Sequence, residues 1–200
     1  EHLISSSGGL YYFLTNEERE VSQEIKSVEV TSSEENSLIR EIIFEEILKD
    51  KSKYRYNPFK NDYPYNRICD SVPHKGKTDQ ELTIEIITPM NDEIPSDQSH
   101  FIMHSAGHKY HLIIKLSDDP TLAKEVTNYK QTEKYILKKH DASVSPSMKD
   151  IMKDLAENNR QRKGRITSIL SDLIIHAIFY SMGSQIEIKA TSPQTAIEDG

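Results

Sequence analysis

Four histidines that lie close together in the sequence are the residues best suited to metal chemistry. His100, His104, His108 and His111 fall within twelve residues, and imidazoles four residues apart on a helix can share one zinc ion. Gly107 interrupts this spacing, and His111 begins an apolar run typical of a strand, so we do not expect one continuous helix to carry all four. We favour a surface loop between strands and keep a zinc site as the alternative, because a metal needs three or four convergent ligands.

A second group of charged residues could meet phosphates or an acidic partner. Arg160, Arg162, Lys163 and Arg165 lie in a stretch without an apolar side chain, at positions 158–165. Cations in such a cluster can neutralise phosphates, although a charged helix centre is more often simply solvated. This stretch is the best interaction surface that the sequence offers, and direct DNA binding through it stays open as an alternative.

Three further patterns are incomplete. Gly76-Lys77-Thr78 has the end of a phosphate-binding loop, but Ser71 stands where that motif requires glycine and a strand rather than a helix follows. Glu187-Ile188-Lys189 is similar to the Glu-x-Lys of metal-dependent nucleases, yet the nearest upstream acid, Asp172, falls in a predicted helix. The single cysteine, Cys69, has no neighbouring base that would activate it, so we expect a structural thiol.

Composition narrows the class of protein. The 200 residues are 36% hydrophobic and 28% charged with a net charge of -7, which suits one domain or two small ones and lacks the footprint of a dedicated nucleic-acid binder. The mean hydropathy is -0.64, and no apolar run approaches the roughly 20 residues of a membrane span, so a membrane-embedded protein is excluded. A single cysteine cannot form an internal disulfide, which fits the reducing environment of the cytoplasm. Because the chain starts at Glu1 rather than Met, we expect a piece of a longer polypeptide.

Hydrophobic periodicity predicts an α+β fold: a small, mostly antiparallel or mixed sheet packed by helices, with one long C-terminal helix followed by a closing strand. Helices are expected over 15–26, 32–48, 119–139 and 147–183, and strands over 81–89, 111–116 and 185–190, with a hairpin around 5–9. The polar centre of the long helix predicts either a break at Gly164 or a course through solvent toward a partner. Residues 49–73 contain Pro58 and Pro64, so we expect an irregular segment packed by its own aromatic side chains rather than stacked on bases.

Several blocks in collinear order resemble a known family, the large P-loop ATPase subunit of bacteriophage-exclusion (BREX) defence systems, of the BrxC or PglY type. These blocks are Tyr11–Arg19, Tyr54–Tyr56, Asp62–Arg67, Glu85–Pro89, Leu116–Pro120, Lys130–Ile136, Asn159–Arg162, Glu187–Ala190 and Pro193–Ala196. The resemblance implies a cytoplasmic parent protein that binds ATP and magnesium and acts with other BREX proteins, including a DNA methyltransferase, to stop phage replication. The nucleotide-binding residues would lie upstream of this chain, which then holds no cofactor itself.

The resemblance also implies a division of the chain and a role. Residues 1–14 would end a winged-helix-like wing hairpin, 15–140 would form an α+β body, 141–192 the long helix plus final strand, and 193–200 the start of a further segment. The expected role is a non-catalytic interaction or coupling module, not an enzyme, and the sequence leaves open whether it forms a homo-oligomer or contacts DNA. The alternative is a histidine-cluster metal-binding domain or a metal-dependent nuclease.

Overall fold

Two compact units make up the chain, and each is discontinuous in sequence. A computed structural model describes residues 4–7, 10–13, 15–76, 78–95, 97–140 and 145–198. Unit 1 comprises Glu1–Glu35 and Lys124–Arg165, and unit 2 comprises Asn36–Ala123 and Ile166–Gly200. The predicted domain boundaries after residues 14, 140 and 192 divide the chain into consecutive segments. The two units instead group segments that are far apart in sequence, so those boundaries stay a prediction.

Unit 1 contains a hairpin and helices. The elements that lie in it wholly or in part are β1 (Ile4–Ser7), β2 (Leu10–Phe13), α1 (Asn16–Lys26), α2 (Ser32–Glu41), α4 (Leu122–His140) and α5 (Pro146–Ile175). The expected hairpin is confirmed, because β1 and β2 pair antiparallel. The spacing of Thr15 and Glu18 predicts a capping box, and the structure forms it: Glu18 N donates to Thr15 Oγ1 at 3.2 Å, and Thr15 N donates to the Glu18 carboxylate at 2.7 Å. Ser32 and Glu35 have the same spacing, but at α2 the capping box is formed one residue earlier, by Thr31 and Glu34.

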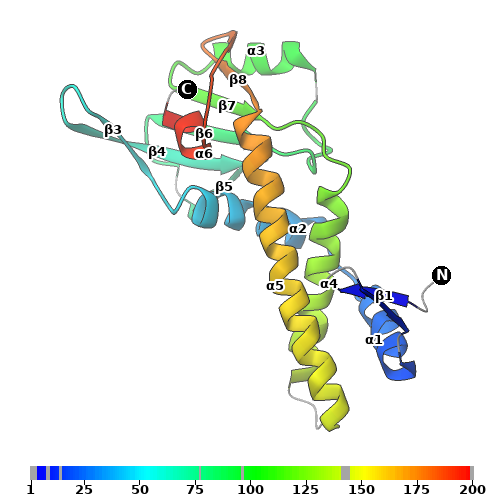
Figure 1. Ribbon diagram of the computed structural model, residues 1–200. Coiled ribbons are helices and arrows are strands. Elements are labelled where there is room, and N and C mark those ends of the chain that lie inside the picture. The colour runs from blue at the N-terminus through cyan, green and yellow to red at the C-terminus, as the bar shows by residue number, and fades with distance from the viewer. Residues whose placement is uncertain are drawn as a thin grey trace. The chain divides into compact units, whose positions relative to one another are not determined.

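Unit 2 is built on a mixed sheet of seven strands. Six strands follow the order β3-β4-β6-β7-β8-β9, and the short strand β5 pairs with β4. The β4–β6 and β6–β7 pairs are parallel and the other pairs antiparallel. The strands are β3 (Lys53–Tyr56), β4 (Asn61–Cys69), β5 (Val72–Pro73), β6 (Leu82–Ile87), β7 (His111–Lys115), β8 (Ile178–Ser181) and β9 (Ser184–Ile186). The expected α+β class is therefore confirmed (Figure 1).

Short helices complete unit 2: the π-helix η1 (Ile42–Ile47), the 3-10 helix η2 (His74–Gly76), α3 (Gln98–Ala106) and α6 (Pro193–Glu198). The π-helix continues α2 and keeps its apolar stripe buried, with Ile42, Ile43 and Phe44 fully inaccessible to solvent. The buried second helix that the periodicity predicts is thus present. Across the part of the chain that the structure describes, no helix combines the length and apolarity that a bilayer crossing requires.

The segment 49–73 is not irregular, so that expectation is wrong. It forms β3, β4 and β5, with Pro58 in the turn between β3 and β4. The amide of Tyr65 donates to the carbonyl of Ser52 across the β3–β4 pair, so the nitrogen of Pro64 faces the opposite side. β6 pairs with β4 only from Tyr65 onward. The missing N–H of Pro64 therefore lies on the side of β4 where, among the described residues, no strand is paired at this position.

The long helix is continuous through Gly164 and ends at Ile175, before the predicted end at Gly183. Residues 178–181 instead form β8, which pairs with β7 and turns back into β9. Met182 and Gly183 both have positive φ, at 47° and 75°, as a two-residue hairpin turn requires. Ile178 fits a helical stripe and a strand equally well, so the hydrophobic periodicity predicts a helix end that lies too far along the chain. The final strand also stops at Ile186, so the prediction of a strand to residue 190 is wrong.

Candidate functional site

Three elements of unit 2 bring the histidine cluster together. His100 and His104 lie one turn apart on α3, the helix ends at Gly107, and His111 is the first residue of β7. The prediction of a surface loop between strands is therefore wrong for residues 98–106, which form the helix α3. The loop after Gly107 places His108 beside the others, with its ring centroid 5.6 Å from that of His104 and 5.7 Å from that of His111.

A carboxylate joins two of these imidazoles. Ligand atoms of Glu85, His104 and His111 all lie within 4.8 Å of one another. Glu85 is on β6, and the parallel register pairs Thr83 with His111, so Glu85 and His111 are diagonal neighbours on one face of the sheet. The same face carries the apolar cluster of Ile87, Phe101, Ile113 and Tyr180, which packs beside the site.

Two of the three groups are buried. Glu85 is 3% exposed and His111 8%, while His104 is partly exposed. His111 Nε2 lies 3.1 Å from Glu85 Oε2, yet among the described residues none forms a hydrogen bond of acceptable geometry with this nitrogen. The other oxygen of Glu85 accepts a long hydrogen bond of 3.5 Å from Ser71 Oγ.

The electrostatics favour an ionised Glu85 and a neutral His104, as the directions of their pKa shifts show. Burial alone would raise the pKa of Glu85, but the side chains of His111 and His104 outweigh it, so the pKa is lower than its ordinary value. Burial lowers the pKa of His104; Glu85 opposes this effect, and the neighbouring histidines add to it. Both shifts favour the protonation states that a metal ion requires of its ligands.

Sequence analysis missed Glu85 as a site residue. The alternation of apolar and polar residues over 81–89 predicts a half-buried strand with Glu85 on its polar face. That expectation is wrong, because residues 84–87 of β6 are all buried. Glu85 lies two residues after Thr83, which pairs with His111. This relationship could have signalled the site, but it becomes visible only when the strand register is known. Of the four predicted histidines, the structure brings His104 and His111 into the ligand group and leaves His100 and His108 adjacent.

The basic residues of α5 do not share one exposed face. Arg160 has a side chain 74% exposed and pairs with Glu157 on its own helix at 2.8 Å. Arg162 is half-buried, at 23%, and Arg165 lies 2.9 Å from Glu125 of α4, all within unit 1. Lys163 is partly exposed. Acidic partners thus neutralise much of this predicted interaction surface.

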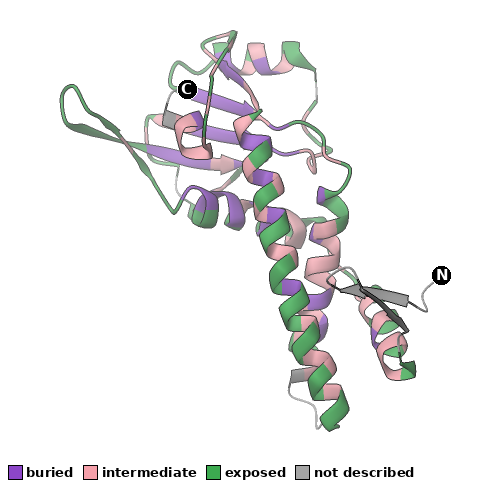
Figure 2. Cartoon of the chain, viewed as in Figure 1, coloured by how far each residue is buried: buried purple, intermediate pink, exposed green. Residues whose placement is uncertain are grey.

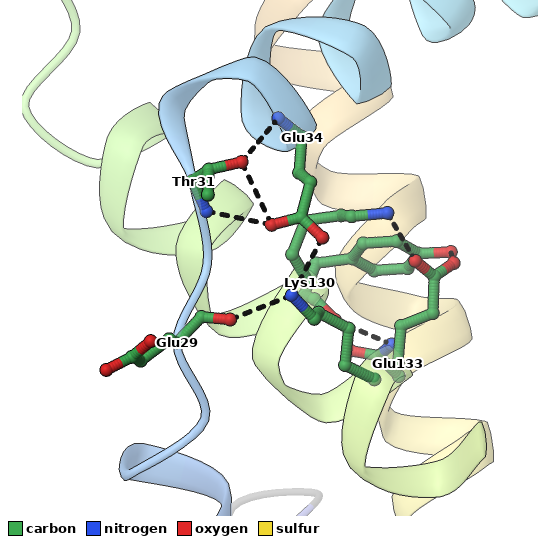
Figure 3. A network of polar contacts seen from close by, with 8 residues as sticks. Glu29, Thr31, Glu34, Lys130 and Glu133 are labelled. Atoms are coloured by element: carbon green, nitrogen blue, oxygen red, sulfur yellow. Dashed lines mark hydrogen bonds and ion pairs between the residues drawn. The ribbon is translucent and has the colours of Figure 1, made fainter. Parts of the chain in front are cut away.

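A polar network holds α4 of unit 1 against the segment that precedes α2. Lys134 donates to the carbonyl of Glu29 at 2.8 Å and to the carboxylate of Glu34 at 2.7 Å. Glu34 also caps α2 through Thr31, as Figure 3 shows. The hydrogen bond from Lys134 is the main cause that lowers the pKa of Glu34 to about 2. These contacts stabilise the helix packing and use groups that were not predicted as functional.

The incomplete motifs lack the structure that their chemistry requires. Gly76 ends η2, and within the described residues the next regular element is the strand β6, not the helix that a phosphate-binding loop precedes. Glu187 and Lys189 lie after β9 and outside a strand. Burial raises the pKa of the Cys69 thiol well above its ordinary value, as expected of a structural cysteine.

A feature that sequence analysis missed is an exposed aromatic hairpin. We call residues 53–64, which form β3, the turn and the start of β4, the aromatic arm. Figure 2 shows that the arm is exposed along its length, in contrast to the buried strands behind it. Tyr56 is 37%, Phe59 71% and Tyr63 40% exposed, and the rings of Tyr56 and Phe59 contact each other with centroids 5.5 Å apart. The aromatics therefore do not pack into a core.

Comparison with known proteins points to one family. The family model described as "BREX ATP-binding protein BrxC 4th domain with six-stranded beta sheet" matches residues 28–200. The main path of the sheet in unit 2 has six strands, with β5 as a short addition, in agreement with that description. The search of solved structures finds no match to the chain.

Proposed function

Since the chain belongs to the BREX BrxC family, as the fourth domain of this ATP-binding protein of phage defence, we propose that it is a non-catalytic docking module that binds another BREX protein. The observation that carries the proposal is the aromatic arm. Exposed aromatic side chains of this size are costly to leave in water, and burying them against a partner gains free energy in proportion to the apolar area removed.

The residue types of the arm are those that dominate protein interfaces. Tyrosine and arginine are enriched among the residues that contribute most to binding, and rigid aromatic rings lose little conformational entropy on binding. The arm presents Tyr56, Phe59 and Tyr63 next to Arg55, whose guanidinium pairs with Asp62 across the hairpin at 3.0 Å. This exposed pair spans the two strands while the rings stay exposed.

The charge of the arm favours an acidic protein surface as its partner. Three cations, Lys53, Arg55 and Lys60, stand against the single carboxylate of Asp62, in a chain of net charge -7. Single-stranded DNA is the other possible occupant of exposed aromatics beside cations. We favour protein because tracking a nucleic-acid backbone takes a longer basic groove, and Arg55 already has an anionic partner.

The finer parts of the proposal concern partners and cofactors. Candidate partners are the other BREX proteins, including the DNA methyltransferase implied by the family resemblance. ATP and magnesium would bind elsewhere in BrxC, so we expect the 200-residue chain to turn over no ATP by itself.

The test is a direct titration. The purified chain is titrated with each purified BREX protein of the same system, and separately with labelled single- and double-stranded DNA at low and physiological salt. We expect saturable binding to at least one BREX protein and no DNA binding that persists at physiological salt. The proposal fails if none of the BREX proteins binds, or if the arm instead binds DNA with the steep salt dependence of phosphate contacts.

A further inference from the structure

We infer that Glu85, His104 and His111 form a binding site for one Zn²⁺ ion, at the junction of β6, α3 and β7 in unit 2. Their ligand atoms lie within 4.8 Å of one another. Two imidazole nitrogens and one carboxylate oxygen are a ligand set that zinc uses in proteins when the fourth position is left to water. The inference is independent of the docking function proposed above.

The buried pair of Glu85 and His111 is the strongest evidence. The oxygen and the nitrogen are 3.1 Å apart, yet within the described residues Nε2 of His111 forms no hydrogen bond. An ordinary ion pair between two buried groups would place the proton between them, since an unsatisfied buried polar atom costs free energy. Two buried ligand atoms that lie close together without a hydrogen bond between them suit a metal site.

The surroundings support a site rather than a chance cluster. Ser71 Oγ approaches Oε1 of Glu85 at 3.5 Å, which leaves Oε2 for an ion. His104 reaches the pair from α3, and its partial exposure provides a route from solvent. His108 lies next to the ligand group, with its ring centroid 5.6 Å from that of His104.

The donor atoms select the class of metal. Imidazole nitrogens suit zinc and the neighbouring transition metals, whereas magnesium and calcium prefer sites made of oxygen alone. Bound zinc would tie α3 to the β6–β7 pair, and a ligand that binds the folded state alone raises the apparent stability by mass action. Zinc should therefore raise the melting temperature of the chain.

The experiment measures zinc binding to the 200-residue chain, purified without an affinity tag and stripped with a chelator. We expect one Zn²⁺ per chain by calorimetry and elemental analysis, and a visible d–d spectrum of tetrahedral Co²⁺ when cobalt is used. His104→Ala and Glu85→Gln should each weaken zinc binding by at least roughly 10- to 100-fold, the range that even supporting residues of metal sites reach. The rise in melting temperature with zinc should disappear in both variants.

A matched control uses a histidine outside the cluster. His176, 69% exposed near the end of α5, contacts the carbonyl of Asp172 and should be replaceable by alanine without loss of zinc. The inference is overturned if fewer than one zinc binds per chain, or if His104→Ala binds zinc as tightly as His176→Ala. His104 is partly exposed, so its variant decides the question even if Glu85→Gln does not fold.

Discussion

Asp50 Oδ1 lies 2.5 Å from Nη1 of Arg67, a guanidinium on β4 whose side chain is only 9% exposed. Asp50 follows the π-helical turn η1 with a positive φ of 54°, and its amide donates to the carbonyl of Phe44 at 2.7 Å. The ring of Phe44 in turn lies 5.9 Å from the guanidinium carbon. The π-helix η1 therefore supplies an aromatic contact, and the turn after it supplies the counter-charge, for a buried cation of the sheet.

We expect Asp50→Asn to destabilise the chain by about 1–3 kcal/mol, because the buried Arg67 would lose its charged partner. Asparagine tolerates the left-handed backbone of this position, so the effect reports the charge and not the turn. The control is Asp62→Asn, which breaks the exposed pair with Arg55 and should cost less than about 1 kcal/mol. Urea unfolding at near-neutral pH measures the change in unfolding free energy for both variants. Equal changes would contradict a special role for the counter-charge of the buried Arg67.

The same pair predicts a pH dependence. The hydrogen bond from Arg67, followed by that from Lys75, lowers the pKa of Asp50 from 3.8 to about 2. Because the folded-state pKa is the lower one, the pair contributes its full stability above pH 3.8 and loses it as the pH falls toward about 2. The difference in unfolding free energy between the wild type and Asp50→Asn should shrink across this window. A difference that stays constant there would show that the ion pair is not its source.

Substitution of two glycines by alanine should change the stability of the chain in opposite directions. Gly183 has a φ of 75° and a Cβ there would lie 3.0 Å from Cβ of Ala106, so Gly183→Ala should cost about 1–2 kcal/mol. Gly164 lies inside the continuous α5, and a Cβ there would meet none of the described atoms within 4 Å. Gly164→Ala should therefore stabilise the chain by about 0.5–1 kcal/mol. Thermal unfolding of both variants checks this, and destabilisation by Gly164→Ala would argue for a break in the helix.

The basic residues of α5 should divide into structural and surface groups. Arg162 Nη1 donates to Asn159 at 3.1 Å, Nε lies 3.8 Å from Glu125, and burial lowers the pKa of the guanidinium. Arg162→Ala should cost about 1–2 kcal/mol through lost packing and hydrogen bonding. Arg160→Ala, at an exposed position, should change the unfolding free energy by less than about 0.5 kcal/mol. Equal losses of unfolding free energy in the two variants would contradict this division into structural and surface residues.

Local signals predicted much of the fold. The capping residues Thr15 and Glu18, the buried apolar stripe of α2 and the alternation in β6 depend on neighbours close in sequence. The prediction failed where a distant partner decides the structure. Pro64 is tolerated because β6 does not pair beside it, and 178–181 forms a strand because β7 offers an edge.

The site was predictable only in part for the same reason. Histidine spacing identified His104 and His111, whereas the approach of Glu85 depends on the parallel register of β6 and β7. The exposure of Phe59 depends on a hairpin, whereas Pro58 and Pro64 led to the expectation of an irregular segment. The cations of α5 gave a clear sequence signal, but Glu125, the partner of Arg165, comes from another helix.

The affinity of the chain for its BREX partner, with and without the aromatic arm, tests the central claim most directly. Phe59→Ser and Leu137→Ser remove apolar side chains of similar exposure, 71% and 65%, from the arm and from α4. We predict that Phe59→Ser weakens binding at least about tenfold, as expected for an interface residue that contributes 1.4 kcal/mol or more, while Leu137→Ser leaves it unchanged. Equal affinities of the two variants for the partner would contradict docking through the arm.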